Sequence, residues 1–172
     1  KIIIAKCPKV YEYKHFCLGH KSFVSSIRFT KIDSLEILIS SDGLGNVCVW
    51  SLEGKSIGES LNLKKSFQSS EEDTNFAIQS LCVADNLVLF VDNLGRLYAA
   101  SLKVVGNDKK SVEWIAIESQ QQTSSSNNNN DGSENVQKLN LPDNIKALSV
   151  ESMQSDLILI GCDNGQLLCT KK

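Results

Sequence analysis

The 172-residue sequence predicts an all-β protein built from repeated four-stranded sheets, and three observations lead to that prediction. Brief runs of β-branched and aromatic residues recur along the chain, each bounded by Asp, Asn, Gly or Ser. Similar turns, in which an aspartate precedes a glycine, separate these runs at comparable places. No segment keeps the apolar period of a sustained helix. Together these features are typical of the blades of a β-propeller.

The predicted strands begin after residue 23 and continue to the end of the chain. Several are almost continuously apolar, which indicates strands that are covered on both faces. They are Val24–Phe29, Glu36–Ser40, Val47–Trp50, Ala77–Val83, Leu87–Val91, Leu97–Leu102, Val112–Ile117, Ile145–Val150, Leu157–Ile160 and Leu167–Cys169.

The turns define an internal repeat. The turn that runs from Asp42 to Gly45 returns 50 residues later as Asp92 to Gly95, and a shorter version begins at Asp163. Aspartate accepts backbone hydrogen bonds in tight turns, and glycine adopts positive φ. We therefore place a hairpin at the centre of each blade. The predicted blade units are approximately 18–61, 75–118 and 136–172.

A polar tract lengthens the interval between the second and third turns from 50 to 70 residues. It is rich in Gln, Ser and Asn and has almost no apolar side chain to offset its ordering entropy. We expect residues 119–134, approximately, to form a disordered loop inserted between blades. The alternative for a Gln/Asn tract is an aggregation-prone segment.

The length of the chain limits the number of blades. A blade needs about 40–45 residues, so this chain provides an incomplete arc of about three to four blades, whereas seven blades would need roughly 300 residues. A closed four-bladed ring fits less well, because the first strand begins in the middle of a blade. We expect the isolated arc to be unstable or oligomeric, because its blade edges are open.

One unit carries the signature of a WD repeat, a Gly19-His20 pair followed 30 residues later by Trp50. In such repeats a hydroxyl on the second strand and a carboxylate in the turn complete a buried chain of hydrogen bonds between the indole and the imidazole. The sequence thus predicts a WD40-type propeller with one structural tetrad. Its members are His20, Ser40, Asp42 and Trp50.

This unit departs from the usual repeat at two positions. Leu44 stands where an aspartate is usual, and Ser51 replaces the aspartate that follows the tryptophan. We expect Asp42 to serve from two positions upstream of Leu44. Because His20 belongs to a buried structural chain, we do not interpret it as a catalytic base. Neither of the other two units contains this Gly-His and Trp combination at the same spacing.

Enzyme signatures are otherwise missing from the sequence. It has no phosphate-binding Gly-rich loop, no G-x-S-x-G and no H-E-x-x-H, and only two histidines. We therefore predict a protein that is not an enzyme, with no catalytic, cofactor-binding or metal-binding residues.

The cysteines point to a reducing compartment. None of the six forms a C-x-x-C pair, and most lie in apolar strand patterns as small hydrophobic residues. We expect the nucleus, with the cytoplasm as the alternative. No apolar run approaches the roughly 20 residues of a transmembrane helix, and no signal peptide is evident. We expect no membrane partner.

The charge is unevenly distributed. Residues 1–31 hold seven basic residues and one acidic residue, a net charge of +6, whereas the rest of the chain has a net charge of −8. A basic segment beside an acidic body can contact RNA or an acidic protein face. The alternative is a solvated edge on which lysines keep exposed strands from pairing.

About the first 50 residues resemble a particular family. The strand K-I-I-I at 1–4 is followed, after about a dozen residues, by F-C-L-G-H-K-S-F-V-S at 16–25. This combination resembles the non-catalytic WD-repeat subunit of the tRNA (guanine-N7)-methyltransferase. The hairpin at 38–50 is similar to the next hairpin of that family.

The resemblance implies a scaffold that binds and stabilises a separate catalytic methyltransferase subunit as a heterodimer, supporting m7G formation in the tRNA variable loop. The family has a basic residue two positions after the lysine of the first strand, where this chain has Ile3. We expect tRNA to be contacted indirectly or through the basic segment 1–31, with lysines as point-charge contacts. The partner interface is expected to include Lys1, Ile3, Lys6, Lys9 and Lys21.

A function of another class remains open at this point. General WD40 adaptors mediate protein–protein interactions in signalling or ubiquitin ligation. Such adaptors usually contain several orthodox repeats, whereas this chain has one.

Overall fold

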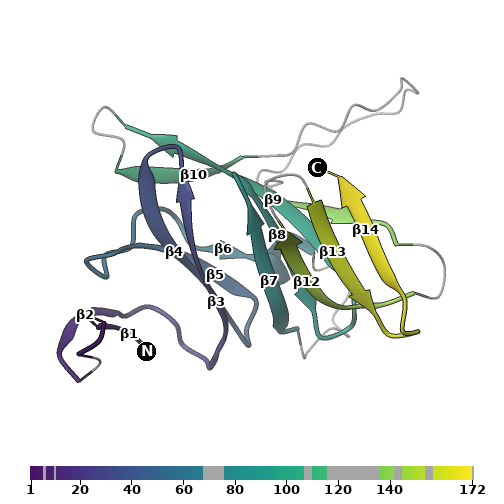
Figure 1. Ribbon diagram of the computed structural model, residues 1–172, viewed down its shortest axis with the longest axis horizontal. Coiled ribbons are helices and arrows are strands. Elements are labelled where there is room, and N and C mark those ends of the chain that lie inside the picture. The colour runs from purple at the N-terminus through teal and green to yellow at the C-terminus, as the bar shows by residue number, and fades with distance from the viewer. Residues whose placement is uncertain are drawn as a thin grey trace.

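The structure is a computed structural model that describes residues 1–5, 7–9, 11–67, 76–106, 110–115, 136–141, 145–153 and 157–171. Four antiparallel sheets and one short helix make up this part of the chain, and the sheets follow one another across the molecule (Figure 1). The described residues contain no helix that is long and apolar enough to cross a membrane.

The first sheet is a two-stranded pair. Its strands are β1 (Ile2–Ala5) and β2 (Tyr13–Cys17). Because side chains alternate along a strand, Ile2 and Cys17 share the buried face, where they form a cluster with Trp50 of the next sheet. Ile3 and Phe16 are paired on the other face and are exposed.

A four-stranded sheet follows, which we call the first full sheet. Its strands, in spatial order, are β3 (Val24–Ile32), β4 (Leu35–Asp42), β5 (Asn46–Ser51) and β6 (Leu61–Asn62), and the helix α1 (Leu63–Phe67) comes next. The strands β4 and β5 contain the continuous apolar runs Ile37–Ile39 and Val47–Trp50. They are joined by the predicted turn, which Gly45 closes with a φ of 77°. A side chain at this φ would be strained, which explains the glycine.

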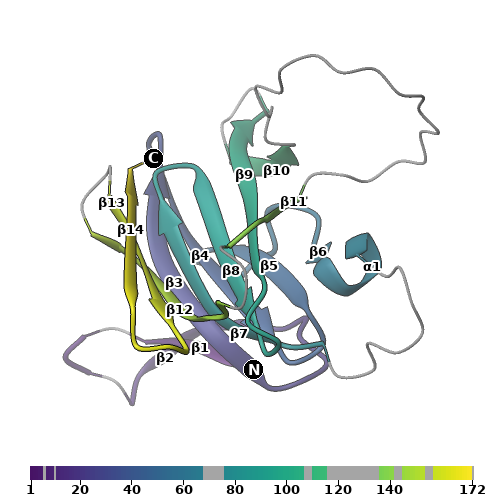
Figure 2. The same ribbon diagram turned by 90° about the vertical axis from the view of Figure 1, so that its right-hand side faces the viewer.

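The second full sheet holds β7 (Ile78–Ala84), β8 (Leu87–Asp92), β9 (Leu97–Val105), β10 (Ser111–Ile115) and β11 (Val136–Leu139). Both β10 and β11 pair with β9, one after the other (Figure 2). Ile115 lies opposite Ser101, and Val136 lies opposite Ala100. The two short strands therefore form one outer strand that residues 116–135 interrupt.

This register corrects two expectations. The tract predicted at 119–134 lies outside the described residues, but its flanks belong to one sheet, so it does not separate two blades as expected. Residues 136–139, which the sequence assigned to the third unit, belong to the second full sheet.

The last sheet has three strands and packs against the second full sheet. The last strands are β12 (Ala147–Met153), β13 (Leu157–Cys162) and β14 (Leu167–Lys171). The first strands of successive sheets, β3, β7 and β12, contact one another in that order. One apolar cluster fills the space between the first and second full sheets, and another fills the space between the second and the last. This is the packing of propeller blades around an axis, as the sequence predicted.

Candidate functional site

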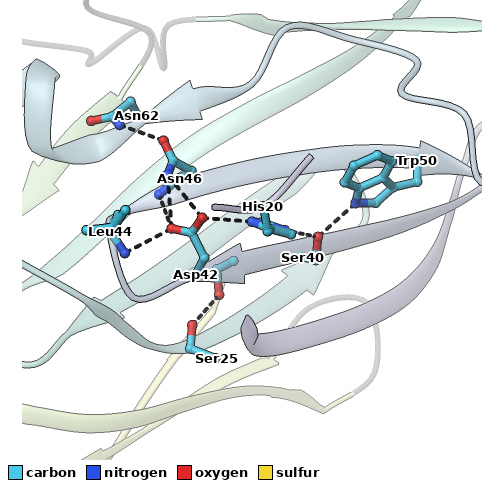
Figure 3. A network of polar contacts seen from close by, with 9 residues as sticks. His20, Ser25, Ser40, Asp42, Leu44, Asn46, Trp50 and Asn62 are labelled. Carbon is cyan, nitrogen blue, oxygen red and sulfur yellow. Dashed lines mark hydrogen bonds and ion pairs between the residues drawn. The ribbon is translucent and has the colours of Figure 1, made fainter. Parts of the chain in front are cut away.

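The four predicted tetrad residues lie in one chain of hydrogen bonds (Figure 3). The Trp50 indole N–H donates to Ser40 Oγ at 2.8 Å, and Ser40 Oγ lies 2.7 Å from His20 Nε2. His20 Nδ1 lies 2.9 Å from Asp42 Oδ2. Every group is satisfied if the serine hydroxyl donates to Nε2 and the Nδ1–H donates to the carboxylate. These hydrogen bonds thus connect the loop before β3, through His20, to β4 and β5.

The Asp42 carboxylate is the hub of this network. Oδ1 accepts the backbone N–H groups of Leu44 and Asn46 at 2.9 and 3.0 Å, so Leu44 contributes its backbone where the repeat usually has an aspartate. Burial acts to raise the pKa of the Asp42 carboxyl, but the hydrogen bonds from His20, Asn46 and Leu44 outweigh it and hold the pKa below its usual value. The Asn46 amide in turn accepts from Asn62, which extends the network to β6.

The second full sheet has a different network around Asp92. Its Oδ1 accepts the backbone N–H groups of Leu94 and Arg96, as in the first turn. Its Oδ2 accepts from the Arg96 Nε–H at 2.6 Å and from the Tyr98 hydroxyl at 2.9 Å. Sequence reasoning missed Tyr98, which the sequence shows only as an aromatic residue of an apolar strand.

The third turn is shifted by one residue from the predicted alignment. Gly165 N–H donates to Cys162 O, just as Gly95 N–H donates to Asp92 O. Cys162 therefore stands at the position of the aspartate. Asp163 instead accepts from the Lys146 N–H, as Asn93 accepts from the N–H of Ala77.

Two residues predicted for the partner interface, Lys1 and Ile3, lie just before and within β1, next to exposed aromatic side chains of β2. Ile3 is 43% exposed and Phe16 41%, and the Lys1 ammonium lies 4.6 Å from the centre of the Phe16 ring. The Tyr13 ring packs at a tilt against Phe16 with centroids 6.2 Å apart. We call these four residues, Lys1, Ile3, Tyr13 and Phe16, the β1–β2 surface. The alternation of β2 could have revealed Phe16, which faces away from the buried Cys17, but not Tyr13, whose position depends on the bulge in the pairing of β1 with β2.

The remaining predicted interface residues are more scattered. Lys9 lies in the connection between β1 and β2, where its ammonium pairs with Glu12 at 3.1 Å. Lys21 is exposed in the loop that follows His20. Lys6 lies outside the described residues.

Three of the described nucleophilic or basic side chains, His20, Cys48 and Cys82, are shielded from a substrate. The His20 side chain is 2% exposed, so a substrate could not reach it. Burial raises the pKa of the Cys48 thiol to about 11 and that of Cys82 to about 12, which keeps both thiols protonated and unreactive at neutral pH. Among the described residues, no cluster of His, Cys, Asp or Glu could hold a metal ion.

Comparison with known proteins agrees with the fold. A family model described as the tRNA methyltransferase TRM82 WD40 domain matches residues 1–171. No curated protein matches the chain.

Two solved structures illustrate the likeness. The Dos1 propeller has a TM-score of 0.51 at 20% identity, over 92% of this chain and 37% of that one. The computationally designed Ika8 protein has a TM-score of 0.46 at 15% identity, over 90% of this chain and 35% of that one. The chain thus spans about a third of the length of each structure. The Dos1 likeness supports the assignment of an incomplete β-propeller.

Proposed function

Since the chain belongs to the family of the tRNA methyltransferase TRM82 WD40 domain, we propose that it is a scaffold that binds and stabilises the catalytic subunit of a tRNA (guanine-N7)-methyltransferase. It supports m7G formation in the tRNA variable loop and performs no catalysis of its own. The observation that carries this proposal is the match over residues 1–171.

The β1–β2 surface is the docking site in this proposal. Exposed aromatic and aliphatic side chains next to a cation are typical of interface centres, where apolar contacts give affinity and charge gives orientation. Ile3 and Phe16 offer the apolar contact. Lys1 adds a positive charge, which its contact with the Phe16 ring holds in place. Ile3 stands where the family has a basic residue, so the contact at this position is apolar.

The tetrad supports this role from beneath. Trp50 packs under Ile2 and Cys17, so the network that holds Trp50 also sets the position of the strand pair above it. A rigid support lowers the entropic cost of docking.

Three further features belong to the proposal. The protein forms a heterodimer with the catalytic subunit. The basic segment 1–31 contacts tRNA through lysine–phosphate pairs or leaves RNA binding to the partner. The complex acts in the nucleus or, as the alternative, in the cytoplasm.

Reconstitution tests this function. The catalytic subunit is assayed for m7G formation on tRNA with and without the protein, and binding is measured by calorimetry. We expect Ile3→Glu to weaken binding at least about tenfold, because a buried interface charge without a partner is costly. Leu94→Glu is the matched control, since Leu94 is 45% exposed but lies in the turn between β8 and β9, away from β1 and β2, and it should change binding less than twofold. Equal m7G formation with and without the protein would contradict the proposal.

A further inference from the structure

A cleft of about 1120 Å³ opens between the first and second full sheets. Its walls are the start of β4, the segment 51–59 that follows β5, and β10 with the end of β9. The β3–β4 and β9–β10 hairpins reach the same side of the molecule (Figure 1). The cleft is slightly larger than the roughly 300–1,000 Å³ of typical small-molecule sites, so it has room for an extended chain segment.

Hydrogen bonds hold the walls of this cleft in place. Val112 N–H donates to Ile57 O at 2.9 Å, and the Trp114 indole N–H donates to Glu59 O at 3.0 Å. Gly58 lies so close to β10 that an added Cβ would be 2.6 Å from Val112 O. The cleft is therefore preformed, which reduces the cost of ordering it when a ligand binds.

The cleft combines an apolar interior with an acidic rim. Val112 and Trp114 are buried and Ile57 is half-buried. The rim has four exposed glutamates and two exposed lysines, which are Glu36, Glu53, Glu59, Glu113, Lys55 and Lys110. Within the part of the chain that the structure describes, no ion pair engages Glu36, Glu59 or Glu113.

This combination selects one kind of ligand. A carboxylate rim attracts cations and repels the phosphates of nucleic acids and acidic lipids. Arginine and lysine carry a cationic head on an apolar stem, so one side chain can contact both the rim and the interior.

We propose that this cleft binds an extended segment of a partner protein that contains arginine or lysine side chains. The stems pack against the half-buried Leu35, Leu52 and Ile57, which line the cleft, and the cationic heads lie at the glutamate rim. The inference is independent of the function proposed for the β1–β2 surface, because it rests on different residues.

Peptide binding to the intact protein tests this inference. The probe is a fluorescein-labelled eight-residue peptide of alternating arginine and valine, followed by fluorescence anisotropy. We expect the triple variant Glu36→Gln, Glu59→Gln, Glu113→Gln to bind about tenfold more weakly, because each exposed charge pair contributes roughly a factor of two to three. The same peptide with glutamine in place of arginine should bind the unaltered protein at least about tenfold more weakly.

Single substitutions supply the matched control. Glu113→Gln should weaken binding about twofold to threefold, whereas Glu12→Gln, which removes an equally exposed charge beside Lys9, should leave it unchanged. The thermal unfolding midpoint shows that each variant is folded. The inference is wrong if the triple variant binds the arginine peptide as tightly as the unaltered protein, or if the glutamine peptide binds equally well.

Discussion

The first and second full sheets bury an aspartate at the same point of their central hairpins but surround it differently. Asp42 and Asp92 are both completely buried, and each accepts two backbone N–H groups of its own turn. Asp42 then binds His20 from the loop before β3. Asp92 binds Tyr98, which lies within the same hairpin.

The difference between the two networks shows that an aspartate at this position can have two roles. Both turns need it, because two backbone donors would otherwise be buried without partners. The first network reaches out of its hairpin through hydrogen bonds, to His20 and through Ser40 to Trp50, and Trp50 supports β1 and β2. Arg96 and Tyr98 of the second network instead contact the Phe76 ring, which comes before β7. The tetrad therefore attaches the preceding strand pair β1–β2, whereas the second network stabilises its own turn and packs against Phe76.

Of the changes considered, replacing Trp50 should reduce the stability of the protein most. Trp50 is opposite Leu38, and the equivalent residue of the second full sheet is Ala100, opposite Val88. We expect Trp50→Ala to destabilise the protein by about 3–5 kcal/mol, because it leaves a cavity in the first sheet that nothing fills. Urea unfolding measures this change.

A conservative variant separates volume from polarity at this position. Trp50→Phe keeps an aromatic ring under β1 and β2 but removes the indole N–H that Ser40 accepts. Its cost should be smaller than that of Trp50→Ala, about 1–2 kcal/mol. If both variants lower the free energy of unfolding equally, the packing of the aromatic ring against β1 and β2 does not contribute to stability.

The two networks can be compared directly by removing one side-chain hydrogen-bond donor to Asp42 and one to Asp92. We expect His20→Ala and Tyr98→Phe each to cost about 1–3 kcal/mol, because each leaves a buried carboxylate with one hydrogen bond fewer. Hydrogen exchange should distinguish them. His20→Ala should speed exchange in β1 and β2, whereas Tyr98→Phe should leave those strands protected. Equal exchange in the two variants would remove the distinction between the networks.

Part of this difference could be predicted from the sequence. His20, Ser40, Asp42 and Trp50 form a local pattern in which each residue type satisfies the next, and the structure places them within hydrogen-bonding distance. Tyr98 was missed, because an apolar strand gives no sign of where a buried hydroxyl will find its acceptor.

Other features depend on pairing between distant segments. The third turn was aligned on Asp163, but the backbone bond from Gly165 to Cys162 shows that the glycine marks the register. The strand Val136–Leu139 has four residues, and only its pairing with β9 assigns it to the second full sheet. Such pairings are not encoded in the neighbouring sequence.

Lowering the pH should reduce the free energy of unfolding through Asp42, by less than the substitutions above. The pKa of Asp42 is below its ordinary value in the folded protein, so the ionised form is stabilised by folding. This contribution is complete above the unfolded pKa of about 3.9 and decreases as the pH falls towards the folded value. We expect Asp42→Asn to remove it. Urea unfolding from pH 6 to pH 3 should show a shallower acid loss in the variant, and parallel curves would count against the role of this carboxylate.

The smallest effect is expected where the outer strand of the second full sheet is interrupted. Because Ile115 and Val136 lie opposite consecutive residues of β9, a direct Ile115–Val136 peptide bond would preserve the register of both strands. Deleting residues 116–135 should therefore change the free energy of unfolding by about 1 kcal/mol or less, with any change favouring the folded state because a loop no longer has to be closed. Urea unfolding of the deletion variant measures this change. A loss of several kcal/mol would mean that the deleted residues contribute to folding, and that the second full sheet, like the first, depends on a segment outside its central hairpin.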